Sequence, residues 1–212
     1  MLTRTAAIAG EAVEFAKVCD VRPGRLQELA GSFGVLAGRN NAERGSFADT
    51  IILAPPPPEA VKVRREVSGC FDGPKAVISL AAGLPVGRLE QEVGPGQAIR
   101  IMPNTPGQVG EAMNLVAYGE TVGAETRVQI EKLLRALGSW LEVNDEQMDY
   151  WCALCAVGPT YIFPVIDALA SVAAAKGLPP AQALQAAAQV VAGASRMVQQ
   201  SGKTIPQLKE MI

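Results

Sequence analysis

The stretch "IMPNTPGQVGEAM", residues 101–113, gathers residues that could contact a ligand where an apolar strand pattern ends. Pro103 and Pro106 each restrict a φ angle, and they leave the amide of Asn104 projecting from a rigid turn. A rigid turn with a projecting amide suits the binding of a small polar molecule. A rigid surface turn without a ligand is the alternative that these residues leave open.

The absence of histidine limits the chemistry that this chain can perform. It excludes Ser-His-Asp and Cys-His nucleophilic catalysis, and the residues alone identify no catalytic side chain. Cys152 and Cys155 have Cys-x-x-Cys spacing, but the other two cysteines, at 19 and 70, do not complete a metal site at matching spacing. We therefore expect no metal. Cys152 and Cys155 are either a redox pair or two buried small residues, and their apolar helical surroundings favour the second interpretation.

Composition and charge indicate an ordinary globular protein. The 212 residues are 49% hydrophobic and 19% charged, which is enough for a sizeable core. The net charge is −2, and no cluster of basic residues is interleaved with aromatic ones, so we expect no nucleic-acid partner. No run of about 18 apolar residues and no signal pattern occurs, so we expect a cytoplasmic protein without a membrane partner.

The first part of the chain alternates short apolar runs with helical patterns, which predicts a parallel sheet covered by helices. Strands are predicted over 13–19, 50–54, 77–81, 98–102, 114–118 and 140–143, and helices over 23–33, 59–67, 85–93 and 125–137, with Gly138 ending the last helix. From residue 145 the pattern is helical throughout. We predict an α/β domain over 1–144 and an all-α domain over 145–212.

The helices of the second domain are rich in alanine, as in "ALASVAAAKG" and "ALQAAAQVVAGAS". Two or three helices alone cannot bury such long apolar faces, so we expect a homodimer or a higher oligomer. Packing solely against the α/β half of the same chain is the alternative.

Four segments in this order resemble pyrroline-5-carboxylate reductases, over nearly the whole chain. They are "VISLAAGLP", "IRIMPNTPGQVGEAM", "GPTYIFPVIDALASVAAAKGLPPAQALQAAAQVVAGASRMV" and "SGKTIPQLKEMI". The resemblance implies a Rossmann-type domain that binds NAD(P)H. It also implies a helical domain that interlocks with the same domain of a second subunit to form the substrate pocket. It also implies reduction of the cyclic imine 1-pyrroline-5-carboxylate to proline. This chemistry tolerates a chain without histidine, because a protonated imine mainly needs the nicotinamide held against its carbon.

The resemblance assigns roles to particular residues. Asn104 would lie near the nicotinamide, and Leu80-Ala81-Ala82 would offer backbone and small side chains so that its ring can approach closely. Asp20 would contact the ribose or serve as a helix cap, and Arg22 beside it would admit NADP; NAD remains possible. The implied cofactor-binding residues are Asn104, Leu80, Ala81, Ala82, Ala54, Pro55, Asn41, Asp20 and Arg22, and the implied substrate-binding residues are Gly158 and Pro159.

Several positions depart from the family pattern. We expect this chain to lack the first Rossmann strand with its glycine-rich loop, and the C-terminal substrate loop. Pro55-Pro56-Pro57 replaces a Val-Lys-Pro element, and "CAVGP" replaces Ser-Gly-Ser-Gly-Pro. The alternative function is therefore a non-catalytic dimeric relative. A β-hydroxyacid dehydrogenase would need a lysine near Gly158, and the sequence has none between Lys132 and Lys176.

Overall fold

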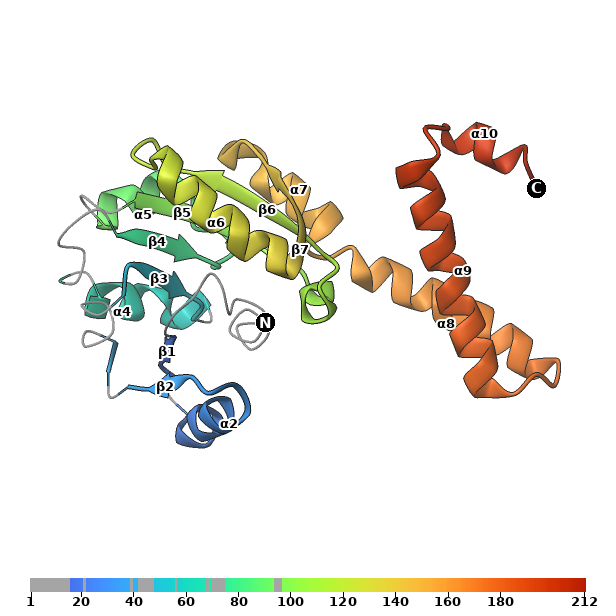
Figure 1. Ribbon diagram of the computed structural model, residues 1–212, viewed down its shortest axis with the longest axis horizontal. Helices are drawn as coiled ribbons and strands as arrows, with labels where there is room; N and C mark the ends of the chain where they lie inside the picture. The colour runs from blue at the N-terminus through green and yellow to red at the C-terminus, as the bar shows by residue number, and fades with distance from the viewer. Residues whose placement is uncertain are drawn as a thin grey trace. The chain divides into compact units, whose positions relative to one another are not determined.

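The computed structural model describes residues 16–20, 22–38, 40–41, 48–55, 57–67, 69, 75–93 and 97–212. The chain divides into two compact units, Met1–Val157 and Gly158–Ile212, and each is described by itself. The first unit contains the strands and the second contains only helices among the described residues (Figure 1). The predicted fold class is confirmed.

A five-stranded sheet forms the centre of the first unit, in the order β3-β4-β5-β6-β7. The strands are β3 (Thr50–Leu53), β4 (Ala76–Ser79), β5 (Gln97–Met102), β6 (Ala112–Tyr118) and β7 (Gly138–Glu142). β3, β4 and β5 run parallel, with Leu53 opposite Ser79 and Ser79 opposite Arg100. The carboxyl ends of these three strands therefore meet at one edge of the sheet.

One strand pairing differs from the predicted parallel sheet, because β6 runs antiparallel to β5 and β7 follows β6 in parallel. The cause is the short connection over residues 103–111, which contains the 3-10 turn η2 (Thr105–Val109) and no crossover helix. A parallel return needs a crossover of about a dozen residues or more, so the chain can only reverse direction here.

Helices cover both faces of the sheet, and the alternation of side chains along the strands decides which residues each helix meets. Ile51, Val77 and Ala98 face α5 (Val86–Val93) through its buried Leu89 and Val93, and the same cluster takes in Val67 of α4 (Pro57–Val67). Ile78, Ile99 and Val116 face α6 (Ala124–Leu137) through Ile130 and Leu134. Leu115 and Ala117 contact Met148 of α7 (Met148–Cys155), which follows the 3-10 turn η3 (Asp145–Gln147).

A second, small sheet pairs β1 (Lys17–Val18) with β2 (Leu36–Ala37) in parallel, around the crossover helix α2 (Pro23–Phe33). The predicted helix over 23–33 is confirmed, and Gly34 closes it with φ 63°. Of the strand predicted over 13–19, residues 13–15 lie outside the described residues.

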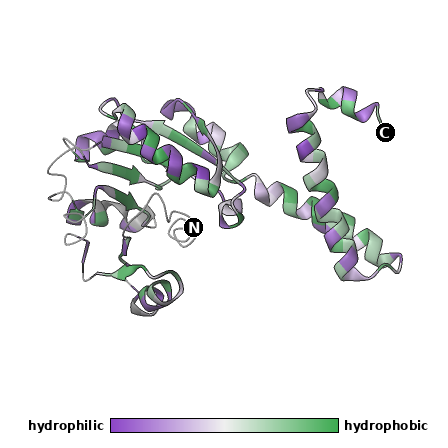
Figure 2. Cartoon of the chain, viewed as in Figure 1, coloured by the Kyte–Doolittle hydropathy of each residue, from purple (hydrophilic) through white to green (hydrophobic). Residues whose placement is uncertain are grey.

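The second unit consists of α8 (Pro159–Ala175), α9 (Pro180–Gln200) and α10 (Ile205–Lys209). Small side chains, Ala170, Ala183 and Ala187, form the buried contact between α8 and α9. Many large apolar side chains on the same helices remain exposed, among them Phe163 at 60% and Val172 at 66%. Figure 2 shows this hydrophobic character along both helices.

The stretch Asp145–Ala175 is the one helical segment among the described residues that could cross a membrane by length and composition, with mean hydropathy 1.6. Turn residues at 156–158 interrupt it, and the unit boundary falls there. An apolar helix that packs against another protein chain meets the same criterion, so this finding does not by itself indicate a membrane protein.

Candidate functional site

The residues that follow β3, β4 and β5 lie at the shared carboxyl edge of the sheet. In open α/β sheets, ligands bind in the crevice outside the carboxyl ends of parallel strands. This edge is therefore the candidate functional site. Three groups of predicted cofactor residues lie there: Ala54 and Pro55 after β3, Leu80 to Ala82 after β4, and Asn104 after β5.

The loop after β4 presents backbone and small side chains. The amide of Leu80 donates to the carbonyl of Leu53 (2.9 Å), and the amide of Ala81 donates to Ser79 Oγ (3.3 Å). Ala81 is buried and Ala82 is exposed, and Gly83 follows with φ 74°, a conformation that favours glycine. Two hydrogen bonds thus fix the loop to the sheet, while the small side chain of Ala82 is exposed.

Asn104 is half-buried, and its amide already has partners at both ends. Its Nδ2 donates to the carbonyl of Cys155 (3.0 Å), and its Oδ1 accepts from the amide of Met113 (3.2 Å). One N–H and one lone pair remain for a ligand, because a primary amide has two donors and two acceptor positions. The ligand-binding role of Asn104 stays a prediction; what the geometry adds is a bond from Asn104 to the end of α7.

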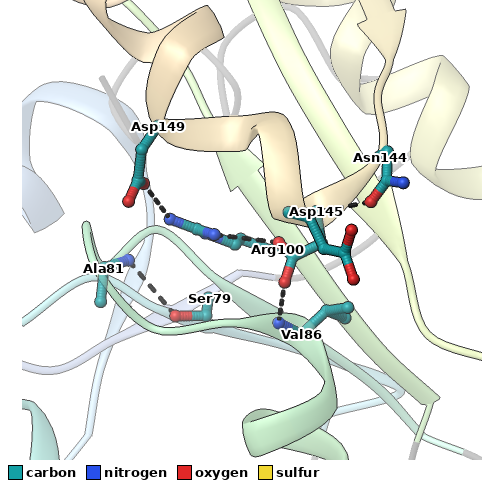
Figure 3. Close-up of polar contacts among 8 residues, drawn as sticks. Ser79, Ala81, Val86, Arg100, Asn144, Asp145 and Asp149 are labelled. Carbon is teal, nitrogen blue, oxygen red and sulfur yellow. Dashed lines mark hydrogen bonds and ion pairs between the residues drawn. The ribbon is translucent and has the colours of Figure 1, made fainter.

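A buried ion pair lies on the face of the sheet that α5 and α7 cover. Arg100 on β5 is 3% exposed, and it donates through Nη1 to Asp145 Oδ1 (2.9 Å) and through Nη2 to Asp149 Oδ1 (3.1 Å). The second oxygen of Asp145 accepts from the amide of Val86, the first residue of α5 (2.7 Å). Figure 3 shows Arg100 between the two carboxylates and Val86 below Asp145.

Sequence reasoning missed this group. Asp145 is 45 residues from Arg100 along the chain, so spacing gives no sign of their contact. The available signal is the position of Arg100 itself, because an arginine inside the apolar run of a buried strand requires a partner for its charge.

Asp20 and Arg22 follow β1 in the small sheet. Asp20 accepts from the backbone amide of Arg22 (2.8 Å) and from its guanidinium Nε (3.1 Å). Hydrogen bonds from the Arg22 side chain and backbone lower the pKa of the Asp20 carboxyl. The cap of α2 is Arg22, not Asp20, so the helix-cap interpretation of Asp20 is wrong. The charge of Asp20 is instead neutralised locally, and the Arg22 side chain is 73% exposed.

Asn41 and the two cysteines of α7 also have defined surroundings. Asn41 Nδ2 donates to Glu66 Oε2 on α4 (2.6 Å). Cys152 and Cys155 are free thiols, and burial raises the pKa of both. A raised pKa lowers the thiolate fraction, so these surroundings oppose redox chemistry; because both side chains are only partly buried, the buried-residue interpretation stays a prediction. No group of potential metal ligands occurs among the residues that the structure describes.

Comparison with known proteins identifies the family. The chain is 34% identical over 189 residues to a pyrroline-5-carboxylate reductase of Corynebacterium melassecola, covering 87% of this chain and 70% of that protein. The chain belongs to the pyrroline-5-carboxylate reductase family. Residues 145–212 match the model described as pyrroline-5-carboxylate reductase dimerisation.

Solved structures agree with this family in fold. A pyrroline-5-carboxylate reductase of Coxiella burnetii has a TM-score of 0.86 and 26% identity, covering 99% of this chain and 80% of that one. The Plasmodium falciparum reductase, solved with NADP bound, has a TM-score of 0.84 and 23% identity, covering 100% of this chain and 79% of that one. At this level of identity the second likeness concerns the fold alone.

The structure brings together only part of the cofactor set expected for a pyrroline-5-carboxylate reductase. Ala54, Leu80 and Asn104 share the carboxyl edge with their neighbours, whereas Asp20 and Arg22 follow β1 of the small sheet. Gly158 and Pro159 begin α8 in the second unit. The family's dimerisation model begins at 145, whereas the compact units divide after Val157, because α7 packs on the sheet. The boundary between functional domains stays a prediction.

Proposed function

We propose that this protein reduces 1-pyrroline-5-carboxylate to proline with NADPH as the hydride donor. The observation that carries the proposal is the match to a pyrroline-5-carboxylate reductase over 87% of the chain. The carboxyl edge of the sheet supports it, because Ala82 is a small exposed side chain there and Asn104 keeps hydrogen-bonding capacity.

NADPH, when bound, supplies the hydride that the imine carbon accepts. The residues of the chain would bind and orient the reactants: Ala81 and Ala82 would line the ring, and Asn104 would fix the plane of its amide. A protonated imine already carries its positive charge, so the site needs positioning and exclusion of water more than an acid or base. Gly158 and Pro159 are the proposed substrate contacts.

We prefer NADP to NAD for this protein on two grounds. The Plasmodium falciparum reductase of the same fold is solved with NADP bound. In this chain, Arg22 neutralises the carboxylate of Asp20, which would otherwise repel a 2′-phosphate, and its exposed guanidinium can itself contact that phosphate.

We further propose that the protein is a homodimer formed by the second unit. The match of residues 145–212 to a dimerisation model and the exposed apolar side chains of α8 and α9 support it. A cytoplasmic location agrees with the free thiols of Cys19, Cys152 and Cys155, since reduced cysteines persist there.

The reductase assay follows NADPH oxidation with 1-pyrroline-5-carboxylate and the full chain. Ala82→Phe places a bulky ring at the proposed nicotinamide surface and should lower kcat/KM at least about tenfold. Val128→Phe, at another exposed apolar position, on α6, is the matched control and should leave kcat/KM unchanged. No turnover by the unsubstituted chain at saturating substrate would favour the non-catalytic relative. If both variants lower kcat/KM equally, the carboxyl edge of the sheet is not the nicotinamide-binding site.

A further inference from the structure

We propose that polar clamps at the two ends of α7 hold this helix on the sheet, and that Arg100 and Asp145 are positioning residues for the reductase reaction. The start clamp is the Arg100–Asp145 ion pair, and the end clamp is the bond from Asn104 to the carbonyl of Cys155. The effect on turnover rests on the proposed function, whereas the clamps themselves are a property of the chain.

The start clamp joins three elements at one carboxylate. Asp145, at the start of η3, is 16% exposed and binds Arg100 on β5 with one oxygen and the first amide of α5 with the other. Asp149, on the first turn of α7, adds a second bond to Arg100 but is 80% exposed, so water weakens its share. A buried ion pair gains little stability over a well-packed apolar pair. Its presence on a strand whose other buried residues, Ala98, Ile99 and Ile101, are apolar therefore points to a task other than stability.

The end clamp lies at the other end of the same helix. Asn104 joins the turn after β5 to the carbonyl of Cys155, the last residue of α7, and to the amide of Met113 on β6. Between the clamps, Met148 is fully buried against Leu115. The eight residues of α7 span about 12 Å at 1.5 Å per residue, so the clamps restrain both tilt and slide of the helix.

Both clamps attach to the loops that carry the proposed nicotinamide contacts. Val86 ends the connection that contains residues 80–82, and Asn104 belongs to the turn after β5. A displacement of α7 therefore shifts the two loops relative to each other. Catalysis by positioning is sensitive to such shifts, since misplacement by about 1 Å can cost about a hundredfold in rate.

Thiol labelling tests the clamps without reference to activity. Cys152 and Cys155 lie on α7, and both are partly buried against the cluster of Leu115, Ala117 and Met148, which should slow labelling by a maleimide while the helix is docked. Asp145→Asn keeps an acceptor for Val86 but removes the charge that Arg100 faces, and we expect at least about tenfold faster labelling of the peptide that carries both cysteines. Mass spectrometry separates this peptide from those of Cys19 and Cys70. Glu142→Gln, which breaks the exposed Arg127–Glu142 pair, is the matched control and should leave the rate unchanged.

Steady-state kinetics then tests positioning. Arg100→Lys keeps the charge but loses the two-pronged geometry, and we expect kcat to fall about tenfold at a temperature well below melting. If Arg100 and Asp145 act as one unit, the double variant Arg100→Lys, Asp145→Asn should lose less than the product of the two single effects.

The outcomes separate the two proposals. Unchanged labelling in Asp145→Asn and Arg100→Lys would overturn the clamps. Faster labelling with unchanged kcat and KM, or fully multiplicative effects on kcat, would overturn the positioning role. An inactive unsubstituted chain would refute the proposed reductase function and the positioning role with it, while the labelling rates would still decide whether the clamps exist.

Discussion

Replacement of Asn104 by alanine should destabilise the first unit far more than an ordinary turn substitution. The change removes two hydrogen bonds at once, from Nδ2 to Cys155 and from Met113 to Oδ1. Each neutral bond contributes about 1 kcal/mol net, and a partner left without a bond in a half-buried position costs up to about 1–3 kcal/mol. Because water can reach half-buried groups in part, we expect a total loss of about 2–3 kcal/mol.

Thr105→Ala is the matched control within the same turn. Thr105 is exposed, and exposed substitutions usually change the free energy of unfolding by less than about 0.5 kcal/mol. For a unit of this size, a loss of 2–3 kcal/mol corresponds to a melting temperature lower by roughly 4–12 °C.

Tryptophan fluorescence during urea unfolding gives the measurement. The only two tryptophans are Trp140 on β7 and Trp151 on α7, so the signal reports on the sheet and on the helix that Asn104 holds. If Asn104→Ala and Thr105→Ala unfold at the same urea concentration, the hydrogen bonds of the Asn104 amide do not stabilise the first unit. Met-Pro-Asn-Thr-Pro is then an ordinary rigid turn. An unchanged Trp151 emission maximum in folded Asn104→Ala would also contradict a helix displaced at its carboxyl end.

Three further predictions follow from other parts of the first unit. Arg22→Ala should raise KM for NADPH at least about fivefold while leaving KM for NADH nearly unchanged, because it removes the positive charge beside Asp20; equal changes for both cofactors would exclude a role in 2′-phosphate binding. Gly138→Ala should cost more than about 3 kcal/mol and leave little folded protein by circular dichroism, since Gly138 has φ 139° and an added Cβ would overlap the backbone of Ala112; a normal melting curve would refute it. Burial raises the pKa of Tyr118 to about 12, so its protonated form is favoured on folding, and the associated stability is complete below pH 10 and is lost as the pH rises toward 12; Tyr118→Phe should lack this loss in urea unfolding, and parallel pH profiles of the two proteins would disprove the assignment.

The sequence was sufficient for elements in which one pattern dominates. The apolar runs at 50–54 and 77–81 became β3 and β4. All four residues of β4 are buried, whereas β3, at the end of the strand order, buries Ile51 and Leu53 and leaves Thr50 and Ile52 partly exposed. Gly138 ends α6 as expected, and the proximity of Ala112 explains why no larger residue fits there. Such features depend on residues that are close together along the chain, so they can be predicted from the local sequence pattern.

Features that depend on distant pairs were not predictable in this way. The two-residue strand β2 has an exposed side-chain pattern, so nothing in its residues separates it from a loop. The bond between Asn41 and Glu66 joins residues 25 apart, and Asn104 contacts a residue 51 positions away. For Asn104, the sequence indicated an important amide, but the protein partners of that amide came only from the fold.

The placement of charge in the first unit agrees with a reaction that depends on orientation. Among the described residues at the carboxyl edge, those at 54–55, 80–82 and 103–105 include no acid and no base. The charged side chains Arg100 and Asp145 lie instead on the α5 and α7 face of the sheet, bound to each other. A reaction that needed a proton donor at this edge would place an ionisable group within hydrogen-bond reach of the reacting atoms. Hydride transfer to an imine that is already protonated has no such requirement. The charged side chains of Arg100 and Asp145 can therefore serve to join β5, α5 and the start of α7, the elements around the site.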